Sequence, residues 1–485
     1  MSIGDKNAAR IGAIWSASSS IVAMITQLGR VMILTRFLEK SDFGVVAIVN
    51  VIIGLCTVFT DLGFASVLLY KKNMDNQEFS SLYWLQNIVF GVMYLLLLLI
   101  CPLIANFYEE PQLLDVIPLS GLGIIFLAIG KQYETVLQIN YRFRTLAIRN
   151  IVTNILSLIF ATILAYKQMG VYSLVLSTLL QLFLLNLWNI ASAYKNRPLS
   201  LTLSFKKVLP LAKIGMYQTY TRVLDYFSSK LDVIIIGKFL GTEALGIYDL
   251  AKSLVYRIID FIRSVIAQVA TPIITNNNDN DELVRGRFLQ LTSFVATTCV
   301  PICFIFATFG KEILYIAYGS NYTNAAFVVS IFSLTTLISC ITSGFDILGV
   351  AKGRTDLNFK NTLYRTIIST PFIIIASLFD INIVAVVQLL LSIPLSFLFW
   401  RIVVTKTYPL DPTLFFKQLL DISIAFVVIS IIVGIVNFLL TDFAIMPEKI
   451  VFIFKICLYC ILVLFVCLTV IKTRIINVYR LFFNR

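Results

Sequence analysis

VMILTRFLEKSDFG, residues 31–44, and VIIIGKFLGTEALG, residues 233–246, are two versions of one passage that lie 202 residues apart. In both versions an apolar run ends in a base, a short polar turn follows, and a glycine, Gly44 or Gly246, opens the next apolar run. A membrane chain built from two similar halves suits a transporter, because two halves can rock around one site between them. The repeat therefore predicts transport before any other motif is considered.

The composition is that of a membrane protein with many spans. Apolar residues make up 59% of the chain and charged residues only 13%, whereas soluble chains average about 25% charged residues. The apolar runs have the roughly 17–25 residues that a membrane helix needs, and they are too long for barrel strands. The chain has no histidine, which excludes histidine-based acid–base catalysis and metal binding. The eight cysteines all fall in apolar runs and are expected to be small buried hydrophobes, so we expect no metal and no prosthetic cofactor.

We expect an all-α fold with about fourteen membrane spans, and an even number puts both termini on one side. The spans are expected near 11–35, 44–66, 81–105, 113–131, 150–166, 171–193, 214–236, 245–268, 289–310, 324–348, 362–379, 382–404, 418–440 and 450–471.

The basic residues predict the orientation of the chain. Of the 39 lysines and arginines, 26 fall in loops or tails on the side of the termini, six fall on the other side, and seven fall within spans. Loops rich in lysine and arginine stay in the cytoplasm, so both termini are predicted to be cytoplasmic. The net charge of +13 then reflects membrane topology, and we do not expect a nucleic-acid partner.

The loops on the outer side are short, which bears on the class of function. The longest, around residues 311–323, is barely a dozen residues. Membrane glycosyltransferases and polymerases that act on lipid-linked sugars usually need a large outer loop for their active site. The chain also has no GxxxxGK[ST] motif for direct coupling to ATP. Both observations argue against an enzyme.

The two copies of the repeat begin at the first and seventh spans, so six spans separate them and both halves have the same orientation. A second echo supports this arrangement, because Arg144–Asn150 resembles Arg354–Asn361. We therefore expect an N-terminal lobe over 1–200, a C-terminal lobe over 201–405, and two additional spans with a cytoplasmic tail over 406–485.

Charged residues are concentrated in the seventh and eighth spans. Five bases and four acids fall there: Arg222, Lys230, Lys252, Arg257, Arg263, Asp225, Asp232, Asp249 and Asp260. Each central charge costs about 2.5–3.5 kcal/mol on insertion scales, so nine of them imply a surface lined by protein or water. At 100° per residue, Asp249, Lys252, Tyr256, Asp260 and Arg263 of the eighth span form one stripe along the helix.

Two interpretations of these charges remain open. In the first they form a structural ladder, in which Arg222 faces Asp260 and Asp225 faces Arg257 across two antiparallel helices. In the second they line a cavity that meets a polar or anionic cargo. The better candidates for cargo contact are the bases that have weaker partners in the ladder: Lys230, Lys252 and Arg263.

The repeat also pairs charges of opposite sign. Arg30 aligns with Asp232, and Asp61 aligns with Arg263. We hypothesise that the first pair closes the cleft between the halves toward the outside and that the second closes it toward the cytoplasm.

Three stretches resemble the Wzx-type polysaccharide repeat-unit flippases, particularly the branch of the colanic acid exporters. They are DFGVVAIVNVIIGLCTVFTDLGFASVLLYKK (42–72), LQINYRFRTLAIRN (137–150) and SSKLDVIIIGKFLGTEALGIYDLA (228–251). The likeness extends through the twelfth span and implies the fold of multidrug-and-toxin-extrusion transporters, with two six-helix lobes in a V around a central cavity. Leu231 is a departure, because related sequences often carry asparagine just before the aspartate of the seventh span.

The resemblance implies a cargo, namely a short sugar chain on undecaprenyl diphosphate. It implies a bacterial inner-membrane protein that works by alternating access, together with membrane lipids and the polymerase and chain-length machinery as partners. By analogy, coupling to a proton or sodium gradient is expected. The candidates for the substrate-binding cavity are Arg30, Asp61, Arg222, Asp225, Lys230, Asp232, Lys252, Arg257, Asp260 and Arg263.

A cytoplasmic loop is expected to hold Arg142, Arg144 and Arg149, which could bind the anionic lipid head before entry or could serve only to orient the chain. The rival functions are a drug or cation exporter of the same fold and a flippase for peptidoglycan precursors. A cation exporter should have a cavity dominated by acids, which is not the pattern here.

Overall fold

The computed structural model describes residues 3–60, 74–201, 205–275, 281–342, 344–408 and 410–412, together with short pieces between 415 and 462. Over this part of the chain the regular structure is entirely helical, with no β-strand. The prediction of an all-α fold is confirmed for these residues. Asp61, one of the predicted site residues, lies outside them.

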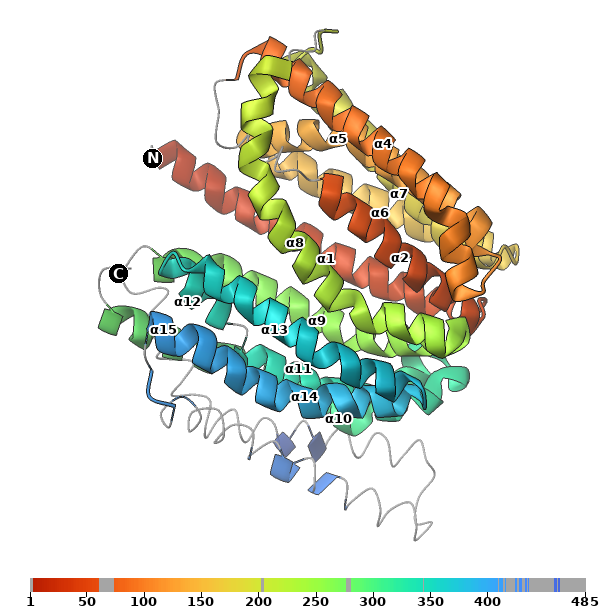
Figure 1. Cartoon of the computed structure of the whole chain (residues 1–485), viewed down its shortest axis with the longest axis vertical. Coiled ribbons are helices and arrows are strands. Elements are labelled where there is room, and N and C mark those ends of the chain that lie inside the picture. Colours follow the sequence, from red (N-terminus) through yellow and green to blue (C-terminus); the bar gives the residue numbers. More distant parts are fainter. Residues whose placement is uncertain are drawn as a thin grey trace. The chain divides into compact units, whose positions relative to one another are not determined.

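The helices follow the order of the expected spans (Figure 1). In the first part of the chain they are α1 (Ile3–Leu34), α2 (Lys40–Thr60), α4 (Asn76–Tyr108), α5 (Leu113–Ile139), α6 (Phe143–Tyr166), α7 (Val171–Ala193), η1 (Tyr194–Asn196), α8 (Phe205–Phe239) and α9 (Gly241–Thr275). The second part contains α10 (Asp281–Tyr318), η2 (Ser320–Ala325), α11 (Ala326–Thr342), α12 (Phe345–Ala351), α13 (Thr355–Ser377), α14 (Ile381–Phe399), η3 (Trp400–Val404) and α15 (Thr405–Thr407). Where they are described, the first twelve expected spans fall on these helices; residues 61–66 of the second span and most of the last two spans lie outside the described residues.

The sequence fixes where a long helix such as α4 begins and ends. Asp75 and Glu78 form a capping box at its first turn, which satisfies backbone N–H groups that have no partner within the helix. Glu109 ends the helix with a left-handed backbone conformation. Between these two ends run 33 residues, or about 50 Å of helix, which exceeds the thickness of the bilayer core.

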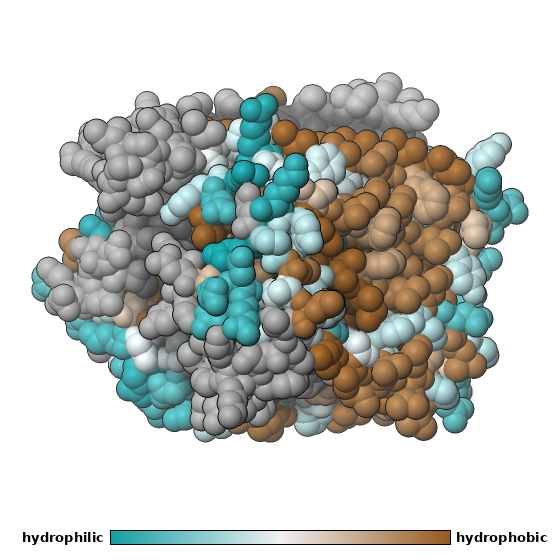
Figure 2. Space-filling view, turned by 90° about the horizontal axis from the view of Figure 1, so that it is seen from above, coloured by the Kyte–Doolittle hydropathy of each residue, from teal (hydrophilic) through white to brown (hydrophobic). Residues whose placement is uncertain are grey.

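Nine helices in the described part of the chain are long and apolar enough to cross a membrane. The long helices α8, α9 and α13 are not among them. Many large apolar side chains are exposed, as expected for a lipid-facing surface: Leu99 and Leu103 on α4 are 74% and 70% exposed. Figure 2 shows a broad hydrophobic face with hydrophilic residues gathered beside it. The protein is therefore a multi-pass membrane protein.

The chain forms two compact units. The first comprises Met1–Leu250 with Ala317–Gly319 and Ser377–Ile381, and the second comprises the remaining residues. Helix α8 belongs to the first unit because it packs along α2 and α4 (Figure 1). The lobes predicted from the repeat, residues 1–200 and 201–405, are a different division of the chain and stay a prediction.

Within the first unit, α5 packs against both α4 and α7, and α6 packs against α1 and α7. Tyr133 is fully buried between α4 and η1, with its ring 5.9 Å from that of Phe79. The second unit has its own core, in which Phe345, Trp400 and Phe415 pack ring against ring. Each unit therefore has an independent core on which a site can be built.

Candidate functional site

The predicted site residues of α8 that the structure describes differ in their access to solvent. Arg222 and Asp225 are exposed, Lys230 is half-buried, and Asp232 is only 4% exposed. Burying a carboxylate is costly unless it is hydrogen-bonded or paired, so Asp232 requires a specific partner.

Asp232 is held by Tyr248 on α9. The Tyr248 hydroxyl donates to Asp232 Oδ2 at 2.6 Å, and the backbone N–H of Val233 donates to Asp232 Oδ1 at 2.9 Å. Tyr248 is fully buried, and short hydrogen bonds to an ionised carboxylate are among the stronger ones in proteins. This bond joins α8 to α9 across their turn and gives a structural role to Tyr248, which lies in the stretch 228–251 that resembles the flippases.

The predicted pair of Arg30 with Asp232 is not tested by these contacts. Arg30 lies on α1, and its Nη1 donates to the Ser157 hydroxyl on α6 at 3.4 Å. Ser157 in turn donates to the Ser177 carbonyl on α7 at 2.8 Å. Arg30 thus continues a polar path through the first unit, and its pairing with Asp232 stays a prediction.

On α9 the charges contact side chains of the same helix. Arg263 Nη1 lies 3.3 Å from Asp260 Oδ1, three residues earlier. Lys252 Nζ lies 5.7 Å above the ring of Tyr256, within the range of a cation–π interaction. Arg263 thus has an acidic neighbour one helical turn earlier, and its role as a cargo contact stays a prediction.

The ladder between α8 and α9 joins residues of the two compact units and stays a prediction. It can be tested by substitution: alanine at Arg222 should be rescued by alanine at Asp260 if the two form a pair. A double variant no better than the single variants would contradict the ladder.

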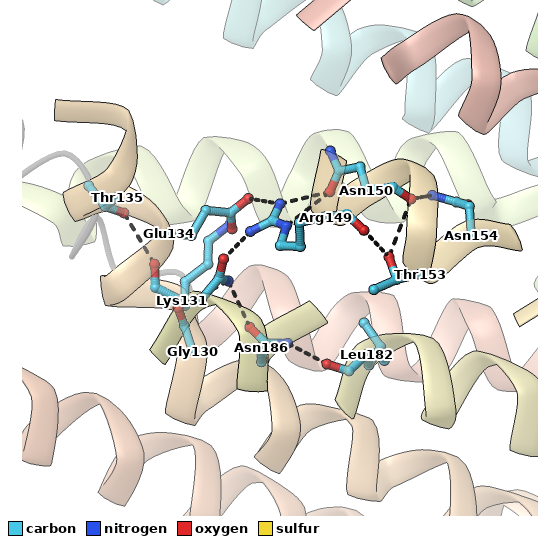
Figure 3. Close-up of polar contacts among 11 residues, drawn as sticks. Gly130, Lys131, Glu134, Thr135, Arg149, Asn150, Thr153, Asn154, Leu182 and Asn186 are labelled. Carbon is cyan, nitrogen blue, oxygen red and sulfur yellow. Dashed lines mark hydrogen bonds and ion pairs between the residues drawn. The ribbon is translucent and has the colours of Figure 1, made fainter. Parts of the chain in front are cut away.

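A polar cluster of the first unit surrounds Arg149 (Figure 3). Its guanidinium donates to Glu134 on α5 at 3.2 Å, to Asn150 at 2.8 Å, and to the buried Asn189 on α7. Lys131 lies 3.5 Å from the other carboxylate oxygen of Glu134. Three helices thus meet at one ion pair.

Arg149 therefore does not lie in a loop where its side chain could bind a lipid headgroup. It is 2% exposed, because α6 begins at Phe143 and carries it into the helix packing. We correct that expectation for Arg149. Arg142 and Arg144 are exposed, with Arg144 5.6 Å above the ring of Trp15, so these two keep access to a headgroup.

Sequence reasoning missed a contact between α2 and α8. The hydroxyl of Tyr226 lies 3.1 Å from the backbone carbonyls of both Asn50 and Val51. Gly54 makes room for it, because a Cβ there would lie 2.5 Å from Tyr226 Cζ. In the sequence, Gly54 stands one helical turn after Asn50 and could have indicated a close approach of another element. Only the fold shows that the Tyr226 side chain occupies the space beside it.

An ion pair lies at the end of α8. Lys238 Nζ is 2.8 Å from Glu109 Oε1, just after α4. The hydrogen bond and charge of Lys238 hold the pKa of Glu109 below its usual range. As for metals, the described residues contain no group of three or more Cys, Asp or Glu placed to hold an ion.

Comparison with known proteins agrees with these features. The chain is 25% identical over 349 residues to the teichuronic acid biosynthesis protein TuaB of Bacillus subtilis, covering 72% of each chain. It is 22% identical over 368 residues to the lipopolysaccharide biosynthesis protein WzxC of Escherichia coli, covering 75% of this chain and 74% of that one. It is 21% identical over 434 residues to the succinoglycan biosynthesis transport protein ExoT of Rhizobium meliloti, covering 88% and 86%.

Two solved structures show the same fold. The lipid II flippase MurJ in an inward closed conformation aligns with a TM-score of 0.73 at 16% identity, covering 97% of this chain and 99% of that one. A multidrug resistance MATE transporter in an inward-facing conformation aligns with a TM-score of 0.59 at 12% identity, covering 80% and 98%. At these identities the likeness shows the fold alone.

The resemblance to Wzx-type flippases noted in the sequence is confirmed by these matches. The family described as polysaccharide biosynthesis protein matches residues 33–327. Because this match covers more than half of the 485 residues, the chain belongs to the polysaccharide biosynthesis protein family.

Proposed function

We propose that the protein is a flippase that carries lipid-linked oligosaccharide repeat units from the cytoplasmic to the outer leaflet of the bacterial inner membrane. Its membership of the family supports this, as do relatives named for making or transporting surface polysaccharides. The proposed topology has fourteen spans, two six-helix lobes with two additional spans, and both termini in the cytoplasm.

The observation that carries the proposal is the band of charge on α8 and α9. A helix that faces lipid all round would not keep Arg222 and Asp225 exposed, because central charges are costly in hydrocarbon. The same side chains are suited to a path through which a polar head crosses while its lipid tail stays in the bilayer. Such a protein needs two states whose populations the cargo shifts.

We propose undecaprenyl diphosphate as the lipid carrier of the sugar. Arginine and lysine in a site of low dielectric constant bind a diphosphate well, since each hydrogen bond is assisted by charge. Of the arginines in the cytoplasmic segment, Arg142 and Arg144 are the candidates for first contact with this headgroup, because both are exposed. Polymerase and chain-length proteins would then receive the flipped units.

We propose that an ion gradient drives the cycle, with Asp61, Asp225 and Asp260 as the nominated acids. Replacing each with asparagine tests this nomination. The coupling acid should lose transport when changed, whereas Glu243, an exposed acid at the start of α9, should tolerate glutamine.

Deletion of the gene tests the function. We expect repeat units to accumulate on their carrier inside the cell and surface polysaccharide to disappear, with restoration by the wild-type gene. Variants Arg222→Gln and Lys230→Gln should restore less than the wild type, whereas Lys406→Gln, at an exposed base of α15 that is not among the predicted cavity residues, should restore fully. Normal polysaccharide without accumulation would contradict the proposal, and drug sensitivity in its place would favour the exporter.

A further inference from the structure

The two copies of the repeated passage meet backbone to backbone. A Cβ added at Gly44 would overlap the Thr242 carbonyl oxygen and lie 2.6 Å from its carbonyl carbon. A Cβ added at Gly246 would overlap the Lys40 carbonyl oxygen and lie 3.0 Å from its carbonyl carbon. Both contacts lie within the first compact unit, where the first turn of α2 crosses the first turn of α9.

The crossing is reciprocal. In the sequence repeat, Gly44 corresponds to Gly246 and Lys40 corresponds to Thr242, each 202 residues apart. Gly44 lies against Thr242, which is the equivalent of Lys40, and Gly246 lies against Lys40 itself. A twofold relation between two copies produces this exchange of partners. The repeat in the sequence and the contacts in the structure are independent observations, and they agree.

The bases just before the crossing show a similar exchange. Lys238 contacts Glu109, in the turn between α4 and α5. Its equivalent, Arg36, lies against the turn after α10, where a Cβ added at Gly319 would be 2.7 Å from Arg36 Nη1. The base of each copy, Arg36 or Lys238, thus lies against a turn that follows a long helix of the opposite half of the sequence.

Glycine has a clear physical role at this crossing. The missing Cβ would point at a carbonyl oxygen, so only the glycine hydrogen fits between the Cα and that oxygen. Any side chain would have to push a backbone, which cannot rotate out of the way. Small residues allow two membrane helices to approach closely in this way.

The ion pairs around the crossing add little to its strength. Lys40 Nζ is 3.5 Å from Glu243 Oε1, but the Glu243 side chain is 70% exposed, and that of Glu109 is 80% exposed. Exposed ion pairs contribute little to stability, because water screens both charges. The contact at the crossing therefore rests mainly on close backbone packing.

We propose that this reciprocal glycine crossing is the closure that shuts the outer end of the transport path, and that Gly44 and Gly246 are the positioning residues that let it close. The inference rests on the proposed alternating-access function. Its place follows from the proposed topology with a cytoplasmic N-terminus, because the crossing lies at the end of α1 opposite the N-terminus. The two copies part when the path opens outward and return to the same contact when it closes.

The first test measures how easily the closure opens. In a variant without native cysteines, Asn50→Cys on α2 reports access to a membrane-impermeant maleimide added from outside. Gly44→Ala and Gly246→Ala should each raise the rate of labelling by about 5–150-fold, because overpacking strains only the closed state. Because the two glycines occupy equivalent positions of the repeat, the two substitutions should raise the labelling rate by similar factors. Gly91→Ala is the matched control, since a Cβ on that helical glycine would meet nothing within 4 Å.

The second test remains informative if the alanine variants fold poorly. Cysteines replace Lys40 and Glu243, whose side chains meet across the crossing, and a short bismaleimide tethers them. Tethered protein should lose transport at least tenfold, whereas the same variant capped with a monofunctional maleimide should keep it. Full transport by tethered protein would overturn the proposal, as would equal labelling rates for Gly44→Ala, Gly246→Ala and Gly91→Ala.

These two tests separate the inference from the proposed function. Labelling reports the closure without any knowledge of the cargo. A shift in labelling without movement of lipid-linked sugar would refute the function and leave the closure standing. Normal flipping with no effect of alanine or tether would refute the closure alone.

Discussion

Replacing Arg149 with methionine should destabilise the first unit without any direct effect on cargo. The guanidinium is 2% exposed and bonds to Glu134, Asn150 and Asn189 on three helices. Methionine keeps the apolar stem of the side chain and removes the charge. The substitution leaves the carboxylate of Glu134 without this partner and a fully buried amide oxygen of Asn189 without its donor.

The magnitude follows from burial. Removing one partner of a buried ion pair costs about 3–5 kcal/mol. The Glu134 side chain is 22% exposed, so water can reach it and the lower end, about 3 kcal/mol, applies. A unit of this size loses roughly 2–4 °C of melting temperature per kcal/mol, so we expect a fall of about 6–12 °C.

The assay is the melting temperature of purified protein in detergent, with Arg142→Met and Arg144→Met as matched controls. Arg144→Met removes a contact with the ring of Trp15 worth about 0.5–1 kcal/mol and should shift the melting temperature by a few degrees at most. Arg149→Lys should recover only part of the loss, because an ammonium cannot reproduce the planar fork. An Arg149→Met protein as stable as the controls, yet inactive, would refute the structural role and restore Arg149 as a cargo contact.

Three further predictions follow from single contacts. Tyr248→Phe leaves Asp232 buried without its 2.6 Å donor and should cost about 1.5–3 kcal/mol of stability, measured by thermal unfolding. Because Lys238 lowers the pKa of Glu109, their pairing stabilises the protein above the ordinary pKa of glutamate and is lost as the pH falls through the lowered value. The difference in melting temperature between wild type and Glu109→Gln should therefore be largest at neutral pH and vanish in acid, and a constant difference would contradict it. Gly54→Ala should weaken the packing of α2 on α8, lowering the melting temperature more than Gly91→Ala does.

The sequence predicted the helices well and their ends poorly. Hydropathy placed the fourth span at 113–131 and the fifth at 150–166, whereas α5 runs to Ile139 and α6 begins at Phe143. Hydropathy detects the apolar segment that matches the bilayer and not the helical turns that continue beyond it. Arg149 was assigned to a loop for that reason, and its burial follows from those extra turns packing together.

The contacts between helices depend on register, which a single sequence shows only in part. Tyr248 reads as one more residue of an apolar run until α8 and α9 are placed side by side and its hydroxyl meets Asp232. The glycines of the repeat stood out in the sequence, but only as the start of two helices. Their function as a crossing requires the two copies to be seen in contact.

Movement of a lipid-linked oligosaccharide by the purified protein tests the central claim most directly. Vesicles would contain the protein and a carrier lipid bearing a short sugar chain, with an impermeant oxidant added outside to modify every accessible sugar. We predict that protected sugar from the inner leaflet becomes accessible with wild-type protein, and far more slowly with protein tethered between the cysteines that replace Lys40 and Glu243. Sugar that stays protected with correctly folded wild-type protein would contradict the account.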